Sequence, residues 1–138
     1  MTTTHAHYDL GYGVTCEWQN DWGLAIYTVP DVQPATIDAY INGLLDTAEN
    51  WFADKPLRTL HDLSSSKIFL TGYARKRLLD VADRSRHMTV YRAILVHDPF
   101  MESVMNRFIQ FQLKRRTNGI SRVFHDYDDA MQWLNNQP

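Results

Sequence analysis

The sequence has little cysteine, no long apolar run and no excess of positive charge, and each shortage narrows the class of protein. Cys16 is the only cysteine, so neither an internal disulfide nor a thiolate metal cluster can form within one chain. The longest apolar runs, such as residues 93–96, fall far short of the roughly 20 residues that span a bilayer. Residues 1–7 contain no basic segment followed by an apolar one, so no secretory signal is predicted. The formal net charge of -2 lacks the basic excess of most nucleic-acid-binding proteins. We therefore expect a cytoplasmic protein with no transmembrane segment and no nucleic-acid partner.

Signature motifs of catalysis are also missing. The chain has no Gly-x-Ser-x-Gly elbow, no Walker-type phosphate loop, no His-Glu-x-x-His helix and no dinucleotide fingerprint. Cys16 lies in an early predicted strand with no helix N-terminus predicted beside it, so nothing activates its thiol. No catalytic set is complete, and the sequence predicts a protein that is not an enzyme and needs neither a metal nor a cofactor.

Length and periodicity indicate one domain. A chain of 138 residues with 44% hydrophobic and 22% charged residues buries one core and is too short for two. Residues 1–8 are polar and without periodicity, which predicts a flexible N-terminal arm before a domain over residues 9–138. Two β-like runs, residues 14–18 and 24–29, flank the turn-rich Gln19-Asn20-Asp21 and predict a hairpin. Apolar residues at helical spacing over residues 37–52 predict a helix that Lys55-Pro56 ends.

From there strands and helices alternate. The pattern predicts strands at residues 57–63, 89–97 and 120–124, and helices at residues 71–84, 99–116 and 126–135. The second of these strands is apolar over its second half, which indicates burial on both faces. The order β-β-α-β-α-β-α-β-α predicts an α/β domain with a mostly parallel central sheet, right-handed crossovers and an N-terminal β-hairpin.

Over about residues 12–136 this order of elements resembles the STAS domain, and more closely its SpoIIAA-like bacterial branch. Asp62-Leu63-Ser64 resembles the family's Asp-Leu-Ser at the end of the third strand. Arg122-Val-Phe-His-Asp-Tyr-Asp-Asp-Ala-Met-Gln-Trp-Leu134 resembles the ending common in the SpoIIAA-like branch. The resemblance implies a regulatory, protein-binding module like the anti-sigma-factor antagonists. The branch is also similar in fold to CRAL-TRIO lipid carriers, which implies a small-molecule or lipid-binding domain as the alternative.

The helix predicted from residue 71 begins with cations, although helix N-termini carry partial positive charge and favour acidic residues. Cations at such an end attract an anion, while the plainer alternative is a solvated helix surface. The candidate anion-binding or phosphorylated residues are Ser64, Ser65, Ser66, Thr71, Gly72, Arg75, Lys76 and Arg77. In antagonist-type STAS domains a serine at the start of this helix is phosphorylated, and Thr71 most nearly matches it. Phe69-Leu70-Thr71-Gly72 stands here where that family has Asp-Ser-Ser-Gly.

Three His-Asp pairs recur at the C-terminal ends of predicted parallel strands: His61-Asp62, His97-Asp98 and His125-Asp126. These ends share one edge of the sheet, where open α/β folds bind ligands, so the pairs could hold a metal or transfer protons. The structural alternative, which the sequence favours, assigns Asp98 and Asp126 to helix caps and Asp62 to a turn.

The helix predicted over residues 99–116 has an unusually wide apolar stripe. Phe100, Met101, Val104, Met105, Phe108 and Phe111 are expected to form its core side, and Ile109 and Leu113 widen it. Core packing accounts for such a stripe, and the alternative is a homodimer interface or an apolar ligand pocket. The candidate residues for that interface or pocket are Met105, Phe108, Ile109 and Leu113.

Overall fold

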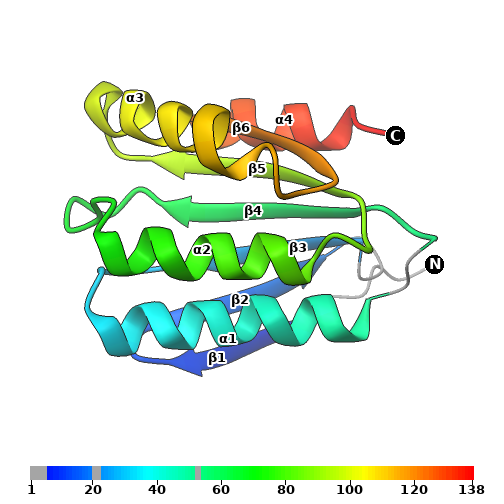
Figure 1. The fold of residues 1–138 in the computed structure, drawn as a ribbon, viewed down its shortest axis with the longest axis horizontal. Coiled ribbons are helices and arrows are strands. Elements are labelled where there is room, and N and C mark those ends of the chain that lie inside the picture. Colours follow the sequence, from blue (N-terminus) through cyan, green and yellow to red (C-terminus); the bar gives the residue numbers. More distant parts are fainter. Residues whose placement is uncertain (1–5, 20–22, 52–53) are drawn as a thin grey trace.

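The computed structural model describes residues 6–19, 23–51 and 54–138 of the chain (Figure 1). Its elements alternate along most of the sequence, and the third helix ends in a π-helical turn, η1. In chain order they are β1 (Ala6–Gly11), β2 (Val14–Gln19), β3 (Leu24–Thr28), α1 (Pro34–Asn50), β4 (Leu57–Leu63), α2 (Gly72–Arg84), β5 (Val90–Val96), α3 (Pro99–Phe108), η1 (Ile109–Leu113), β6 (Gly119–Phe124) and α4 (Tyr127–Asn135).

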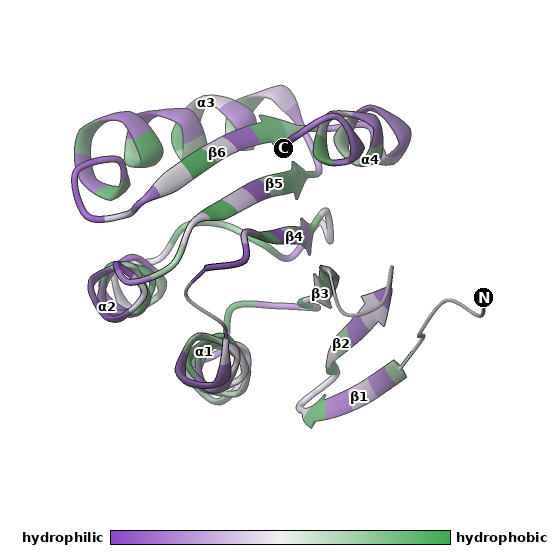
Figure 2. Ribbon diagram, turned by 90° about the vertical axis from the view of Figure 1, so that its right-hand side faces the viewer, coloured by the Kyte–Doolittle hydropathy of each residue, from purple (hydrophilic) through white to green (hydrophobic). Residues whose placement is uncertain are grey.

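A single six-stranded sheet, in the order β1-β2-β3-β4-β5-β6, organises the described residues. The pairs β1–β2 and β2–β3 are antiparallel, and β3, β4, β5 and β6 are parallel. Because each parallel strand is added on the same side of the previous one, right-handed crossovers place α1, α2 and α3 on one face. The last helix, α4, covers β4, β5 and β6 on the opposite face (Figure 2). The predicted α/β class with a mostly parallel sheet is confirmed.

Most predicted elements are found within a residue or two of their expected ends. The hairpin is the pair β2–β3, and the strand predicted over residues 57–63 is β4. The helix predicted over residues 37–52 begins earlier, at Pro34, and ends at Asn50, while residue 52 lies outside the described residues. None of the described helices is both long and apolar enough to cross a membrane.

The prediction of an N-terminal arm over residues 1–8 is wrong for residues 6–8. Residues 6–8, expected in the arm, belong to β1, while residues 1–5 lie outside the described residues. A turn with positive φ at Gly11, Tyr12 and Gly13 joins β1 to β2. β1 is an edge strand with no fully buried side chain, so it lacks the clear apolar alternation by which a strand is recognised. The element order is therefore β-β-β-α-β-α-β-α-β-α.

The core has one layer on each side of the sheet. On the α4 side, Leu60, Ala93 and Leu95 of the sheet pack against Ala130 and Leu134. On the other side, larger clusters lie beneath α1, α2 and α3. β5 contributes to both layers, as its apolar run predicted.

Two phenylalanines expected in the core are exposed instead. Phe100 is 73% exposed and Phe111 is 63% exposed. At the start of α3, Met101 takes the inward position that Phe100 was expected to share. Further on, η1 has more residues per turn than an α-helix, so the inward position falls on Leu113 and Phe111 turns outward.

Candidate functional site

The loop after β4 is held by its own side chains. Asp62 Oδ1 accepts hydrogen bonds from the Ser64 backbone N–H (3.1 Å) and the Ser64 hydroxyl (2.5 Å). Ser65 Oγ accepts from the Lys67 N–H at 3.3 Å. Asp62 therefore has the predicted turn-forming role, and the loop delivers the chain to the start of α2 in a defined conformation.

Thr71 caps α2. Its Oγ1 accepts a hydrogen bond from the Ala74 N–H at 3.0 Å, and no acidic residue occupies the first turn of the helix. Gly72 is exposed, and a Cβ placed on it would have no neighbour within 4 Å, so close approach does not require a glycine there. Thr71 and Gly72 thus lie where the sequence predicted them, but the local structure needs only the threonine cap.

The three cations at the start of α2 do not form one group. Arg77 turns toward α1, where its Nε lies 3.5 Å from Asp38 Oδ1, and its NH1 lies 3.5 Å from Asp80. Tyr73 also donates its hydroxyl to Asp38. Arg77 is therefore a structural link between α1 and α2, which corrects its expected place in an anion site.

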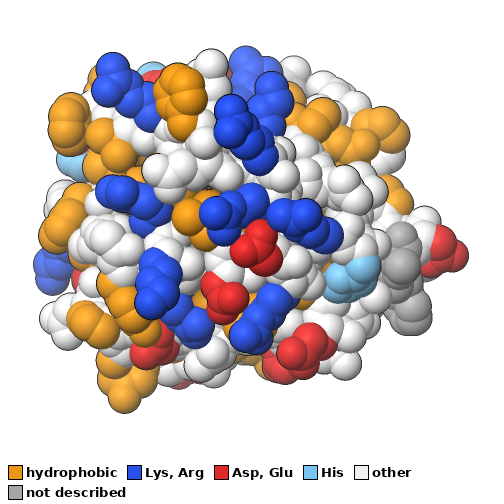
Figure 3. Space-filling model, in the orientation of Figure 1, with side chains coloured by type: hydrophobic (Ala, Val, Ile, Leu, Met, Phe, Trp, Pro, Cys, Tyr) orange, Lys and Arg blue, Asp and Glu red, His pale blue; other side chains and the backbone are white. Residues whose placement is uncertain are grey.

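Arg75 and Lys76 are exposed and form no ion pair with a carboxylate of the described residues. The same holds for Arg107 on α3 and for Lys114 and Arg115 directly after η1. We call Arg75, Lys76, Arg107, Lys114 and Arg115 the cationic face. Figure 3 shows Lys and Arg side chains gathered over α2 and α3, with hydrophobic side chains and also Asp and Glu side chains among them.

Charge is strongly segregated along the chain, which the small net charge conceals. Residues 67–116 contain eleven of the fourteen Lys and Arg residues but only four of the sixteen Asp and Glu residues. This segment therefore carries a formal charge of +7, and the rest of the chain carries -9. A count over segments, rather than the small net charge, would have revealed it.

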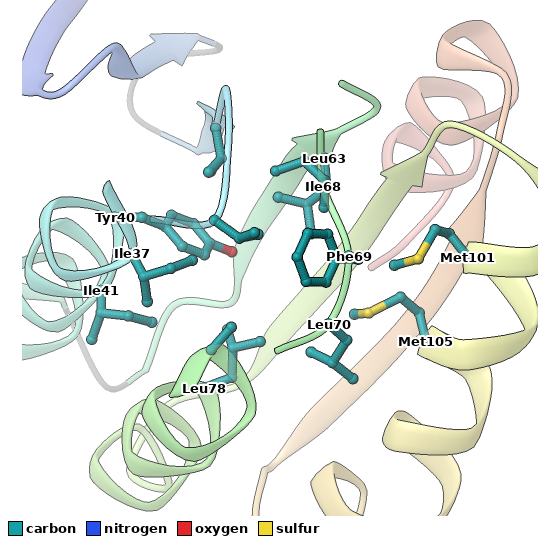
Figure 4. Close-up of a pocket in the computed structure, with 13 residues that line it drawn as sticks. Ile37, Tyr40, Ile41, Leu63, Ile68, Phe69, Leu70, Leu78, Met101 and Met105 are labelled. Carbon is teal, nitrogen blue, oxygen red and sulfur yellow. The ribbon is translucent and has the colours of Figure 1, made fainter. Parts of the chain in front are cut away.

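Beneath α1, α2 and α3 the structure has two small adjoining cavities. The first, of about 30 Å³, is lined by Tyr40, Leu63, Leu78 and Met105 among others (Figure 4). The second, of about 40 Å³, shares these four residues and extends to His61 and Arg92. Each volume holds only two or three water molecules, so neither accommodates an apolar ligand as it stands.

The expected pocket residues divide between two places. Met105, Phe108 and Leu113 are buried and line the second cavity. Ile109 is half-buried and lines a separate open hollow of about 680 Å³ between α3 and β6.

The His-Asp pairs are not brought together into one site. Asp98 accepts from the Met101 N–H at 2.8 Å, and Asp126 accepts from the Asp128 N–H at 2.8 Å, so both aspartates cap helices as predicted. His97 Nε2 lies 3.3 Å from Asp98, and His125 Nε2 lies 3.1 Å from Glu102. Among the described residues, no three His, Cys, Asp or Glu side chains are grouped as metal ligands would be.

His61 belongs to a buried polar network that sequence reasoning did not anticipate. The Tyr40 hydroxyl lies 2.6 Å from His61 Nδ1, and Thr59 Oγ1 lies 2.8 Å from His61 Nε2. Burial, with a smaller effect of the Arg92 charge, lowers the pKa of His61 to about 3. Burial also lowers the pKa of Arg92 to about 10. The one available signal was Arg92 itself, a charged residue within a strand that is otherwise apolar on its inward positions.

No protein-family model, curated protein or solved structure matches the chain. The fold and the site define an α/β domain whose basic residues are concentrated in residues 67–116.

Proposed function

We propose that this chain is a non-enzymatic regulatory module that binds an acidic protein partner through its cationic face. The observation that carries the proposal is that five exposed cations, from α2, α3 and the segment after η1, form no ion pair with any carboxylate of the described residues. Unpaired positive charge on the surface is complementary to an acidic partner. Such a face also speeds encounter with an acidic partner.

Three further features support a binding role. The resemblance to STAS domains implies a regulatory, protein-binding module. Four aromatic side chains are exposed on the loop and helices of this side: Phe69 (59%), Tyr73 (40%), Phe100 (73%) and Phe111 (63%). Exposed aromatic residues and arginines are enriched where proteins bind proteins. An apolar ligand held in the two cavities beneath α1, α2 and α3 has less support, because each cavity holds only a few water molecules.

The proposal is tested by capture from a lysate of the source organism, comparing wild type with a variant carrying Arg75→Ser and Lys76→Ser. The control carries Lys55→Ser and Arg122→Ser, which removes the same charge from outside the cationic face. We expect wild type and the control to recover the same acidic protein and the test variant to lose it. Titration of the recovered protein should then show at least tenfold weaker binding to the test variant. Undiminished binding would contradict the proposed surface.

Phosphorylation of Thr71 would switch this binding off. A phosphate adds about -1.5 to -2 charge next to Arg75, one turn further along α2. Thr71→Asp keeps a good N-cap and adds a charge, whereas Thr71→Asn keeps the cap without one. We expect Thr71→Asp to weaken partner binding at least threefold and Thr71→Asn to leave it unchanged. Equal affinities for the two variants would remove the switch.

A further inference from the structure

An open hollow of about 680 Å³ lies between α3, η1 and the start of β6. Its volume is in the range of small-molecule sites, unlike the two cavities beneath the helices. No carboxylate is among the described residues that line it, and five of its side chains end in an amide, hydroxyl or ammonium group: Asn106, Gln110, Lys114, Thr117 and Ser121. One wall is the π-helical turn η1, and such turns are frequent at functional sites.

A mostly buried cation of β5, Arg92, contacts two of these lining side chains. Its Nη2 donates a hydrogen bond to Thr117 Oγ1 at 3.0 Å, and its Nη1 lies 3.5 Å from Ser121 Oγ. Burial lowers the pKa of Arg92 to about 10, so the guanidinium is still charged at neutral pH. Within the described part of the chain, Arg92 forms no ion pair with a carboxylate. A buried charge is costly unless it is paired, so this cation favours a negative charge nearby.

The hydroxyls of Thr117 and Ser121 transmit this charge to the wall of the hollow. Because each oxygen faces an N–H of Arg92, its own O–H points away from the guanidinium. Neither hydroxyl donates to an acceptor among the described residues, so both can donate to a ligand. A hydroxyl that accepts from a cation is polarised and becomes a stronger donor. Lys114, exposed at the rim, adds a second positive charge.

We propose that the hollow binds a small molecule through an oxyanion, either a phosphate or a carboxylate. The hydroxyls of Thr117 and Ser121 donate to the oxyanion, while Arg92 from behind them and Lys114 from the rim balance its charge. Hydrogen bonds to an ionised acceptor are about twice as strong as neutral ones, which favours an anion over a neutral ligand. The two amide side chains of the lining face the rest of the ligand. This site goes beyond the proposed function and shares only Lys114 with the cationic face.

NMR titrations of the isotope-labelled protein with inorganic phosphate and with malonate, at constant ionic strength in sodium chloride, test the site. We expect at least one of the two anions to shift the backbone amide signals of residues 117–121 in a saturable way. Tighter binding of phosphate would assign the site to phosphorylated compounds, and tighter binding of malonate to carboxylic acids. The proposal is overturned if neither anion shifts these signals, or if the shifts centre on Arg75 and Lys76 instead.

A pair of charge variants separates the site from general attraction of anions. Lys114→Gln and Arg122→Gln each remove one exposed positive charge, but Arg122 lies on the other face of β6, beside α4. We expect Lys114→Gln to weaken binding of the preferred anion at least threefold and Arg122→Gln to leave it unchanged. Equal affinities of the two variants would mean that the anion responds to net charge alone, and the site would be lost.

Thr117→Val and Ser121→Ala test the two hydroxyls. Each variant removes a hydroxyl with little change of shape, and Ser66→Ala removes an exposed hydroxyl from the loop before α2 as the control. We expect each of the first two to weaken anion binding at least fivefold and the control to bind like wild type. Undiminished binding by folded Thr117→Val and Ser121→Ala would refute the proposed donors. If loss of a hydroxyl unfolds the protein, the comparison of Lys114→Gln with Arg122→Gln decides, because both residues are exposed.

Discussion

His61 shows how a single buried residue couples stability to pH. It lies between Tyr40 and Thr59, is only 5% exposed, and faces Arg92 rather than a carboxylate. Its folded-state pKa of about 3 is well below the ordinary value of 6.5, because burial penalises the charged ring. The unfolded chain therefore binds this proton more readily than the folded protein does.

The sign of this difference predicts acid sensitivity. Above pH 6.5 the ring is neutral in both the folded and the unfolded protein, so it does not change the free energy of unfolding. Stability is lost as the pH falls from about 6.5 toward about 3, because only the unfolded chain binds the proton. Between pH 7 and pH 4.5 we expect His61 to remove about 2–3 kcal/mol from the free energy of unfolding. Urea titrations of wild type and His61→Gln check this, because glutamine keeps polar contacts but does not titrate. Parallel pH dependence in the two proteins would contradict it.

Cys16 is predicted to be unreactive in the folded protein. It is 4% exposed, and burial raises the pKa of its thiol to about 11, against the opposing effect of a hydrogen bond with Tyr27. Because the thiolate is the reactive form, a thiol reagent at pH 8 should label Cys16 slowly in buffer and quickly in urea. Rapid labelling of the native protein would show that the strand around Cys16 opens.

At the scale of elements, the helix caps are the most predictable feature. An aspartate directly before apolar residues at helical spacing predicts a helix N-cap. Asp98 and Asp126 fit this rule, and both accept hydrogen bonds from the first turns of their helices. We expect Asp126→Ala to cost about 1 kcal/mol of stability, and Asp126→Ser, which keeps the cap, to cost little. Chemical denaturation of the two variants checks this. An equal loss in both would mean that the charge of Asp126, and not its cap, stabilises the protein.

Irregular elements were not predictable. Periodicity read at 3.6 residues per turn placed Phe111 inside, and only the wide turn of η1 turns it outward. β1 was missed because only Ala6 and Leu10 of this edge strand pack against the core, too few to show an alternating apolar pattern. Local patterns therefore predicted each element that buries a regular apolar face, and failed where the backbone departed from regular geometry or where no side chain was fully buried.

At the scale of the whole molecule, only part of the candidate site could be predicted from the sequence. Arg75 and Lys76 could be identified from their place at a helix start, since that rule is local. The pairing of Arg77 with Asp38 could not, because it joins residues 39 positions apart on different helices. The alignment of α3 with α2, which adds Arg107 to the same face, is likewise a product of the crossover topology.

Reversing one charge of the cationic face should change stability and partner binding in opposite directions. Arg75 is exposed, forms no ion pair within the described part of the chain and lies in the positive N-terminal part of α2, so its own charge destabilises the folded protein. We expect Arg75→Glu to raise the free energy of unfolding by about 0.5 kcal/mol and to abolish binding of the acidic partner. Thermal unfolding in low salt and in 1 M NaCl checks the cause, because screening should remove most of the gain. A less stable variant would show that Arg75 is already held by a carboxylate, and a surface neutralised in that way would have no charge left to offer a partner.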